Sequence, residues 1–255
     1  MKKILRVFIL LILFSCNFVS ASNEFINKNN VEISSTDYTN LLNLGFTRNE
    51  IMNMELDEFN ANKNLKGMIV SQNQISTKNN GYQLLSSGYV NSIDKNTTIS
   101  IISIDKGYRY KVTVEWNKMP SARSYDIIGI GIDPTVKIYS NLYFKINYCY
   151  SSSNCSNNGV FTQSVSSTGA TGVFKLPSGS LSSMSAYLYF DIAKNTDSTI
   201  TKLNAYGDYA HAMKNISLDS ARKHSINRGG ISLDNSISNY YDNMTTATTS
   251  LNCSW

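Results

Sequence analysis

The segment Tyr206–Ala212 gathers residue types that hydrolytic chemistry uses. It holds an acid, two phenols and one of the two histidines of the 255-residue chain. Asp208 and His211 are three residues apart, so they would face one another on a helical turn but project to opposite faces of a strand. No serine lies in a G-x-S-x-G turn that could present a nucleophile. The favoured interpretation is a strand edge whose polar groups are hydrogen-bonded, and a hydrolase using Asp208 and His211 is an alternative.

A second segment, Trp116–Asp126, has the composition of a recognition loop. Trp, Arg and Tyr are enriched at binding hot spots, and Arg123 could pair with Asp126 across the loop. The alternative is a structural connection around a buried Trp116. Together the two segments define one candidate binding set. This set comprises Trp116, Arg123, Tyr125, Tyr206, Asp208, Tyr209 and His211.

Neither a metal nor a cofactor is expected. The chain has no D-x-[DN]-x-[DN]-G run for calcium. It also has no second cysteine or histidine pair that would complete a zinc site with Cys149 and Cys155. Asp and Glu are scattered, so spacing reveals no paired carboxylates for glycoside chemistry. The sequence therefore assigns no catalytic residue.

The first 21 residues have the pattern of a secretory signal peptide. Lys2, Lys3 and Arg6 precede the apolar run Val7–Phe14, and the small residues of Val19–Ala21 follow it. The run is shorter than the roughly 20 residues that a membrane-spanning helix needs. We therefore expect secretion after cleavage at Ala21.

A competing interpretation places a lipid anchor at Cys16. Leu13–Cys16 resembles a lipobox, but the apolar region before it would be very short. Ordinary secretion is favoured, and a lipid-anchored chain that begins at Cys16 is the alternative.

Loss of residues 1–21 changes the charge of the protein. The whole chain carries 23 basic and 18 acidic residues, a net charge of +5. Cleavage leaves 20 basic and 18 acidic residues, a net charge of +2. No Lys/Arg cluster of the kind that neutralises phosphates is present, so nucleic acid is excluded as an expected partner.

The cysteines fit an exported protein. Cys149 and Cys155 flank a plausible hairpin tip, and an oxidising compartment permits a disulfide between them. Closing so short a loop stabilises by roughly 2 kcal/mol. Cys253 would then remain free or pair with another molecule.

Residues 22–66 differ from the rest of the chain. Residues 22–35 are polar and are expected to be disordered. Helical spacing of apolar residues follows, with Gly45 as a stop signal and Thr47 with Glu50 as a capping box. Helices this short are not stable alone. We expect them to cap one end of a β domain that spans residues 67–255.

The clearest strand is Tyr108–Trp116. Its odd-numbered residues are polar, namely Arg109, Lys111, Thr113 and Glu115, and its even-numbered residues are apolar. This alternation predicts one solvent-exposed face and one buried face. Thr97–Ile104 precedes it across a three-residue loop that ends at Gly107. Further strands are expected at Met68–Ile75, Tyr82–Val90, Tyr125–Ile132, Val136–Tyr139, Leu142–Tyr150, Gly159–Val165, Gly172–Leu176, Ala186–Ile192, Thr199–Ala205 and Ile231–Leu233.

Many short strands with turn signals predict a mainly β fold. The expected class is an antiparallel β-sandwich or jelly-roll-like domain with a short α-helical N-terminal cap.

Residues 151–185 hold 15 Ser or Thr, one base and no acid. Such hairpins occur in β-pore-forming toxins, but Gly169, Gly172 and Pro177 interrupt the membrane-facing pattern. A surface hairpin is the favoured interpretation.

Three segments carry a resemblance. Trp116–Asp126, Tyr206–Ala212 and the helical stretch Leu41–Met54 are similar to segments of uncharacterised secreted β-proteins of Gram-positive bacteria. The resemblance implies a shared exported β fold and brings no activity or functional residue with it.

The expected function is non-enzymatic binding of a glycan or protein outside the cell. The first alternative is a β-pore-forming or membrane-active toxin, and the second is a secreted hydrolase.

Overall fold

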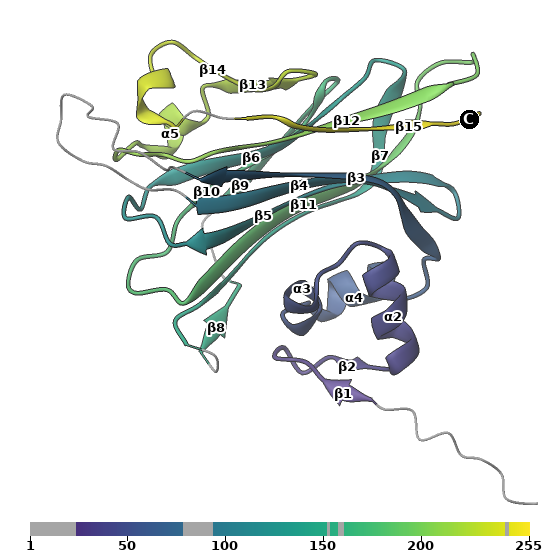
Figure 1. The fold of residues 1–255 in the computed structure, drawn as a ribbon, viewed down its shortest axis with the longest axis horizontal. Helices are drawn as coiled ribbons and strands as arrows, with labels where there is room; N and C mark the ends of the chain where they lie inside the picture. Colours follow the sequence, from purple (N-terminus) through teal and green to yellow (C-terminus); the bar gives the residue numbers. More distant parts are fainter. Residues whose placement is uncertain (1–23, 79–93, 152–153, 158–160, 243–244) are drawn as a thin grey trace, which may run out of the picture.

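The computed structural model describes residues 24–78, 94–151, 154–157, 161–242 and 245–255 (Figure 1). Two large antiparallel sheets dominate it. One sheet has six described strands and the other has five. The proposed signal peptide, Cys16 and the expected strand Tyr82–Val90 lie outside the described residues.

The strands of the six-stranded sheet follow in their order across the sheet. They are β3 (Gly67–Lys78), β4 (Asp94–Ile104), β5 (Gly107–Lys118), β11 (Ser183–Lys194), β7 (Val136–Cys149) and β8 (Cys155–Ser156). The five-stranded sheet consists of β15 (Ala247–Asn252), β12 (Lys202–Ala210), β6 (Tyr125–Ile132), β10 (Gly169–Lys175) and β9 (Phe161–Ser166).

One hydrophobic core lies between the two sheets. Tyr110, Val112 and Val114 of β5 enter it from one side, and Ile128 and Ile130 of β6 enter it from the other. Period-two alternation places these residues on the facing surfaces of their sheets. The expected mainly β class is confirmed, and the packing is consistent with a β-sandwich.

Several strands differ in extent from the expectation. Val136–Tyr139 and Leu142–Tyr150 form one strand, β7, with a register shift against β11. Ile104 pairs with Gly107, so the β4–β5 turn has two residues between the strands, not three. The sequence patterns missed β15, β8 and β13 (His224–Asn227), which pairs with β14 (Gly230–Leu233).

An N-terminal helical unit, residues 24–65, lies on the outer surface of the six-stranded sheet (Figure 1). It contains β1 (Phe25–Ile26), β2 (Glu32–Ile33), α2 (Ser35–Asn43), α3 (Arg48–Met52) and α4 (Leu56–Asn62). The capping box of Thr47 and Glu50 is present at the start of α3, as expected. Residues 22–35 were expected to be disordered, but from Glu24 onward they contain β1 and β2, because Val31 and Ile33 are buried in the unit.

The prediction that one face of β5 is exposed to solvent is wrong. Arg109, Lys111 and Thr113 are buried beneath the helical unit, and Glu115 is half-buried. Their charges meet partners from the unit, since Lys111 Nζ lies 2.7 Å from a Glu50 carboxylate oxygen. The outer face of the sheet is therefore a polar interface and not a solvent surface.

The other outer surface, that of the five-stranded sheet, carries a smaller cover. The β13–β14 hairpin and α5 (Leu218–Ala221) pack there, with Ile226 and Ile231 against Ile127 and Val173 (Figure 1). The short 3-10 helix η1 (Ser238–Tyr240) follows β14. Both sheets are thus covered over part of their outer faces.

The expected disulfide between Cys149 and Cys155 is present, and Cys253 is a free thiol. The bond joins directly paired residues of β7 and β8. A disulfide suggests an oxidising compartment. Among the described residues, no helix combines the length and apolar character required to cross a membrane.

Candidate binding cleft

An open cleft with a volume of about 540 Å³ lies beside β7, the strand next to the edge strand β8 in the six-stranded sheet, and β9, the edge strand of the five-stranded sheet. It is bounded by residues of the helical unit, of β7 and of β9, together with Asn157. The lining residues are Glu55, Asp57, Leu142, Tyr143, Phe144, Lys145, Asn157, Phe161 and Gln163. These residues come from three separate parts of the chain, so only the fold brings them together.

Four consecutive residues of β7, Leu142 to Lys145, line this one cleft. Side chains of a strand alternate between its two faces. Leu142 and Phe144 contact the core between the sheets, whereas Tyr143 and Lys145 point to the helical unit. A cleft that touches all four must follow the edge of the strand.

That edge has no strand beside it among the described residues. β11 pairs with one side of β7 along its whole length, and β8 pairs on the other side with Tyr148 and Cys149.

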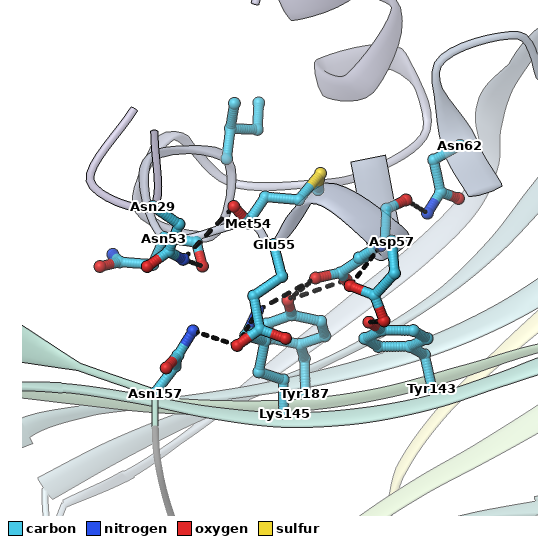
Figure 2. A network of polar contacts seen from close by, with 12 residues as sticks. Asn29, Asn53, Met54, Glu55, Asp57, Asn62, Tyr143, Lys145, Asn157 and Tyr187 are labelled. Carbon is cyan, nitrogen blue, oxygen red and sulfur yellow. Dashed lines mark hydrogen bonds and ion pairs between the residues drawn. The ribbon is translucent and has the colours of Figure 1, made fainter. Parts of the chain in front are cut away.

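Side chains from the start of α4 form the acidic wall of the cleft (Figure 2). The Tyr143 hydroxyl donates to Asp57 over 2.8 Å, and the Asn157 amide donates to Glu55 over 2.6 Å. Partial burial acts to raise the pKa of Asp57, but the Tyr143 hydrogen bond, backbone amides and Lys145 together lower it. Asp57 is consequently ionised at neutral pH.

Lys145 forms the floor beside this wall. Its amine lies 3.5 Å from Glu58 and 3.7 Å from Glu55, and its side chain is only 5 % exposed. No described group makes a hydrogen bond with this nitrogen. A buried ammonium has three donors to satisfy. Lys145 thus keeps hydrogen-bonding capacity beside the cleft.

Glu58 lies behind Lys145 and is fully buried. The Tyr187 hydroxyl reaches both of its carboxylate oxygens at 2.9 Å (Figure 2). Burial raises the pKa of Glu58 from 4.5 to about 7, although Lys145 and Tyr187 act in the opposite direction. The local charge behind the cleft therefore changes near neutral pH.

Replacement of Glu58 by glutamine is expected to remove a pH dependence of stability. Because the folded-state pKa is above the unfolded value, the native state binds the proton more tightly. The contribution is fully present below about pH 4.5 and is lost as the pH rises through about 7. Relative to Glu58→Gln, the wild type should lose about 3 kcal/mol between these limits. Urea unfolding from pH 4.5 to 8 measures this difference.

A matched comparison isolates the Glu58 contribution. Glu55 belongs to the same segment, but its side chain is 45 % exposed. Glu55→Gln should therefore follow the wild-type pH profile within about 1 kcal/mol. Parallel profiles for wild type and Glu58→Gln would contradict the assigned role of Glu58.

The opposite wall of the cleft is aromatic. Phe161 of β9 is 46 % exposed and lies edge-to-face with Phe144 of β7 at 5.2 Å. Gly172 of β10 allows this approach, because a Cβ there would lie 2.9 Å from the Phe144 ring. The cleft therefore has an acidic wall and an aromatic wall, separated by the β7 edge.

A bulge near Asn141 marks one end of the cleft. The β7–β11 register shifts near Asp191, and Asn141 has a positive φ of 53°. Asn tolerates this region better than most residues. Its side-chain amide donates to Asp191 over 2.6 Å. Bulges of this kind redirect a strand next to functional sites.

The structure brings together three of the residues expected from the sequence, but at a buried place away from the cleft. Tyr209 and His211 both contact Asp126, and the Tyr209 ring packs edge-to-face on Trp116 at 5.1 Å. His211 Nδ1 lies 2.9 Å from Asp126, and both residues are fully buried. His211 Nε2 has no hydrogen-bond partner among the described groups.

Asp208 and His211 are not paired. Asp208 accepts from the Ile231 amide at 2.9 Å, on the side of the β13–β14 hairpin. Asp208 belongs to β12, which ends at Ala210, so His211 lies just beyond the strand. Tyr206 instead lies near Asp133, with the hydroxyl 3.4 Å away. The suggested acid–histidine pair therefore exists with a different acid, Asp126.

Arg123 lies near the charge of Asp126 but forms no ion pair with it among the described residues. Asp126 accepts from Tyr209, His211 and the Ala212 amide, and no ion pair to Arg123 occurs in the described part of the chain. Burial lowers the pKa of Arg123, against the opposing effect of Asp126. Tyr125 is half-buried beside Lys175.

Sequence patterns missed the cleft residues. Glu55, Asp57 and Lys145 were not singled out, because their partners lie far away in the chain; Asp57 and Tyr143 are 86 residues apart. A weak signal was present in α4, where Glu58 stands next to the buried Phe59 on a short helix. A buried acid of this kind requires a partner from another element.

Comparison with known proteins leaves the chain without an assigned family. No family model matches it, and no curated protein matches it. One solved structure of limited similarity is that of AvmM, which catalyzes macrocyclization in alchivemycin A biosynthesis. It is 12 % identical, and the match covers 58 % of this chain and 80 % of AvmM with a TM-score of 0.22. So low a score carries no argument about fold or function.

Proposed function

We propose that this chain is a secreted or surface-associated binding protein whose ligand, a protein or a glycan, occupies the cleft beside β7. The observation that carries the proposal is the combination of the cleft of about 540 Å³ with a buried, hydrogen-bond-deficient Lys145 at its floor. Concave sites with a few convergent polar groups and apolar walls are the usual places for ligands.

The disulfide and the N-terminal sequence pattern support an extracellular location. The Cys149–Cys155 disulfide fits an oxidising compartment, and residues 1–21 have the pattern of a signal peptide. Cleavage after Ala21 is proposed, with a lipid anchor at Cys16 as the alternative. We also propose that the chain is related to the secreted β-proteins of Gram-positive bacteria that its sequence resembles.

The two alternative functions draw less support from the geometry. A hydrolase would need an accessible histidine, but His211 is fully buried. A pore former would need to release its hairpin, but β10 pairs over seven residues with β6 and on its other side with β9. Dye release from liposomes of several compositions remains the test of membrane activity.

The proposed fold description is finer than a mainly β class. We propose a jelly-roll-like sandwich in which the helical unit serves as a cap. Support comes from Tyr187 and Tyr189, which are buried between the sheet and the unit. Without the unit, these rings and several charged groups would face solvent.

Reversal of the cleft charge tests the proposed function. The protein is screened against a glycan panel and a random peptide library, and each bound ligand is titrated against a Glu55→Lys/Asp57→Lys variant. We expect binding to weaken or strengthen by more than about ten-fold, according to the charge of the ligand. Calorimetric titration measures the change.

The control is Asp219→Lys, since Asp219 is 93 % exposed on α5 and belongs to the far side of the sandwich. This variant should bind as the wild type does. Failure to bind any ligand of either class, or equal binding by the cleft variant, would refute the proposed function.

A further inference from the structure

We propose that the helical unit is a displaceable occupant of a binding face on the six-stranded sheet, and that an acidic peptide segment of a partner protein takes its place. The face consists of outward-pointing side chains of β5, β7 and β11 that contact the unit, and it is called the tyrosine face below. Its residues are Arg109, Lys111, Tyr143, Lys145, Tyr187 and Tyr189. This ligand is distinct from that of the cleft, so the inference goes beyond the proposed function.

Three parallel tyrosine rings form the centre of the tyrosine face. The ring centroids of Tyr143 and Tyr189 are 5.6 Å apart, and those of Tyr189 and Tyr187 are 6.3 Å apart. The Arg109 guanidinium lies 4.4 Å from the centre of the Tyr189 ring, and the Lys111 amine lies 5.1 Å from that of Tyr187. Tyrosine and arginine are the residue types that dominate the binding energy of protein interfaces.

The first turn of α4 shows which groups this face accepts. The Tyr143 hydroxyl donates to the Asp57 carboxylate over 2.8 Å, and the Tyr187 hydroxyl donates to the Glu58 carboxylate over 2.9 Å (Figure 2). Two carboxylates that are adjacent in sequence thus meet hydroxyls from two different strands. An acidic segment is the natural complement of this arrangement.

The last turn of α4 adds a third contact. The Asn62 amide donates to the Tyr189 hydroxyl over 3.0 Å, and its carbonyl oxygen accepts from Arg109 over 2.5 Å. Each tyrosine hydroxyl of the face therefore has a partner from one seven-residue helix. A helix of this length is not stable alone, so α4 behaves as a short peptide held on a preformed surface.

Charge favours an acidic ligand over a basic one. Arg109, Lys111 and Lys145 are the cations of the tyrosine face, whereas β5, β7 and β11 contain two acidic residues, Glu115 and Asp191. The unit supplies the missing negative charge through its own carboxylates. Once the unit leaves, the face is basic and attracts a carboxylate-rich segment.

The helical unit can leave the sheet without losing its own packing. Its contacts with the tyrosine face are mainly hydrogen bonds and ion pairs, and polar interfaces between parts of one chain permit relative motion. The connection to β3 consists of residues 63–66. The apolar residues that the unit contributes to its own buried cluster are Val31, Ile33, Leu41, Leu44, Phe46, Ile51, Met54 and Phe59.

The closed arrangement leaves polar groups unsatisfied. Arg109 Nη2 and Lys145 Nζ are buried without a hydrogen-bond partner among the described groups. Burial raises the pKa of Glu58 to about 7, so at neutral pH only part of the molecules hold an ionised Glu58 beside Lys145. Unsatisfied buried groups oppose the closed arrangement. A ligand that satisfies them competes with the unit.

Chemical labelling of Lys111 is the first test, since its side chain is only 2 % exposed beneath the unit. The full protein is acetylated with an N-hydroxysuccinimide ester, and the rate at Lys111 is measured by peptide mass spectrometry. Asn62→Ala should raise this rate by at least about ten-fold, because it removes the α4 partner of two face residues. Asn60→Ala, an exposed change on the same helix, should leave the rate unchanged.

Urea distinguishes displacement of the unit from unfolding of the whole protein. Labelling of Lys111 in the wild type should depend less on urea than global unfolding does, which tryptophan fluorescence reports. Equal urea dependences would mean that the unit leaves only when the sandwich unfolds, and this result overturns the inference.

Binding of a synthetic peptide with the sequence of residues 47–65 is the second test. Fluorescence anisotropy should show at least about ten-fold tighter binding to full-length Asn62→Ala than to the wild type, because the tethered competitor is weaker. The same peptide carrying Asp57→Asn and Asn62→Ala should bind at least about five-fold more weakly. Tyr187→Phe, introduced into the Asn62→Ala protein, should weaken the unmodified peptide by about three-fold or more.

Three outcomes would overturn the inference. They are absence of peptide binding to Asn62→Ala, equal binding of the two peptides, and no effect of Tyr187→Phe. Heparin serves as an acidic polysaccharide for comparison. If heparin speeds the labelling of Lys111 and the acidic peptide does not, the choice of a peptide ligand is wrong.

Discussion

Replacement of Lys111 by methionine is expected to lower the free energy of unfolding by about 3–5 kcal/mol. Lys111 is buried beneath the helical unit, where its amine bonds Glu50 at 2.7 Å, the Gly45 carbonyl at 2.9 Å and Thr113 at 2.9 Å. The methionine fills a similar volume but leaves the Glu50 carboxylate buried without its counter-charge. Chemical unfolding by guanidinium, followed by tryptophan fluorescence, measures the change.

Two further variants separate the charge from the packing. In Lys111→Met/Glu50→Gln, no unpaired charge remains, and the amide oxygen can still accept from the Thr47 amide as Glu50 does at 2.8 Å. The double variant should regain more than half of the lost stability. Lys106→Met, an exposed change in the β4–β5 turn, should stay within about 0.5 kcal/mol of the wild type.

Removal of the Lys111 charge should also affect the cleft, because the same helical unit carries Glu55 and Asp57. If Lys111 holds the unit on the sheet, hydrogen exchange in α3 and α4 should rise in Lys111→Met before the sandwich unfolds. Unchanged stability in Lys111→Met would show that the Glu50 pair does not attach the unit.

Asp126→Asn has the second large expected effect, a loss of roughly 2–4 kcal/mol. Asp126 accepts hydrogen bonds from the Tyr209 hydroxyl, from His211 Nδ1 at 2.9 Å and from the Ala212 amide at 2.8 Å. Asparagine keeps one acceptor oxygen and turns a donor amide toward groups that already donate. At least one buried donor is then left without a partner.

Two measurements distinguish a structural role of Asp126 from a catalytic one. Thermal and chemical unfolding should show the loss of stability, whereas Asp219→Asn, a change at a side chain that is 93 % exposed, should stay within about 0.5 kcal/mol of the wild type. Ligand binding in the cleft should be unchanged in folded Asp126→Asn. Full stability of this variant would contradict the account.

Local features of this protein were predictable from the sequence. The alternation of Tyr108–Trp116 gave the course of β5, and the Thr47–Glu50 capping box gave the start of α3. The short Cys149–Cys155 loop also predicted its disulfide. Each depends on residues within about ten positions of one another, and local spacing governs strands, caps and tight loops.

The long-range partners were not predictable. Local spacing suggests Asp208, three residues away, as the acid of His211, but the acid in the structure is Asp126, 85 residues away in the chain. The charged face of β5 was assigned to solvent, yet Lys111 meets Glu50 across 61 positions. A period-two pattern states that two faces differ, but it does not state what covers the polar one.

The sequence by itself determined the mainly β class, the principal strands, the capped helix and the disulfide, because backbone periodicity and short loops are local properties. Only the tertiary structure decided that the helical unit covers a charged sheet face, that Asp126 and not Asp208 contacts His211, and that Glu55, Asp57 and Lys145 meet at the edge of β7. These arrangements depend on charge pairing and burial between distant segments, which local spacing does not encode.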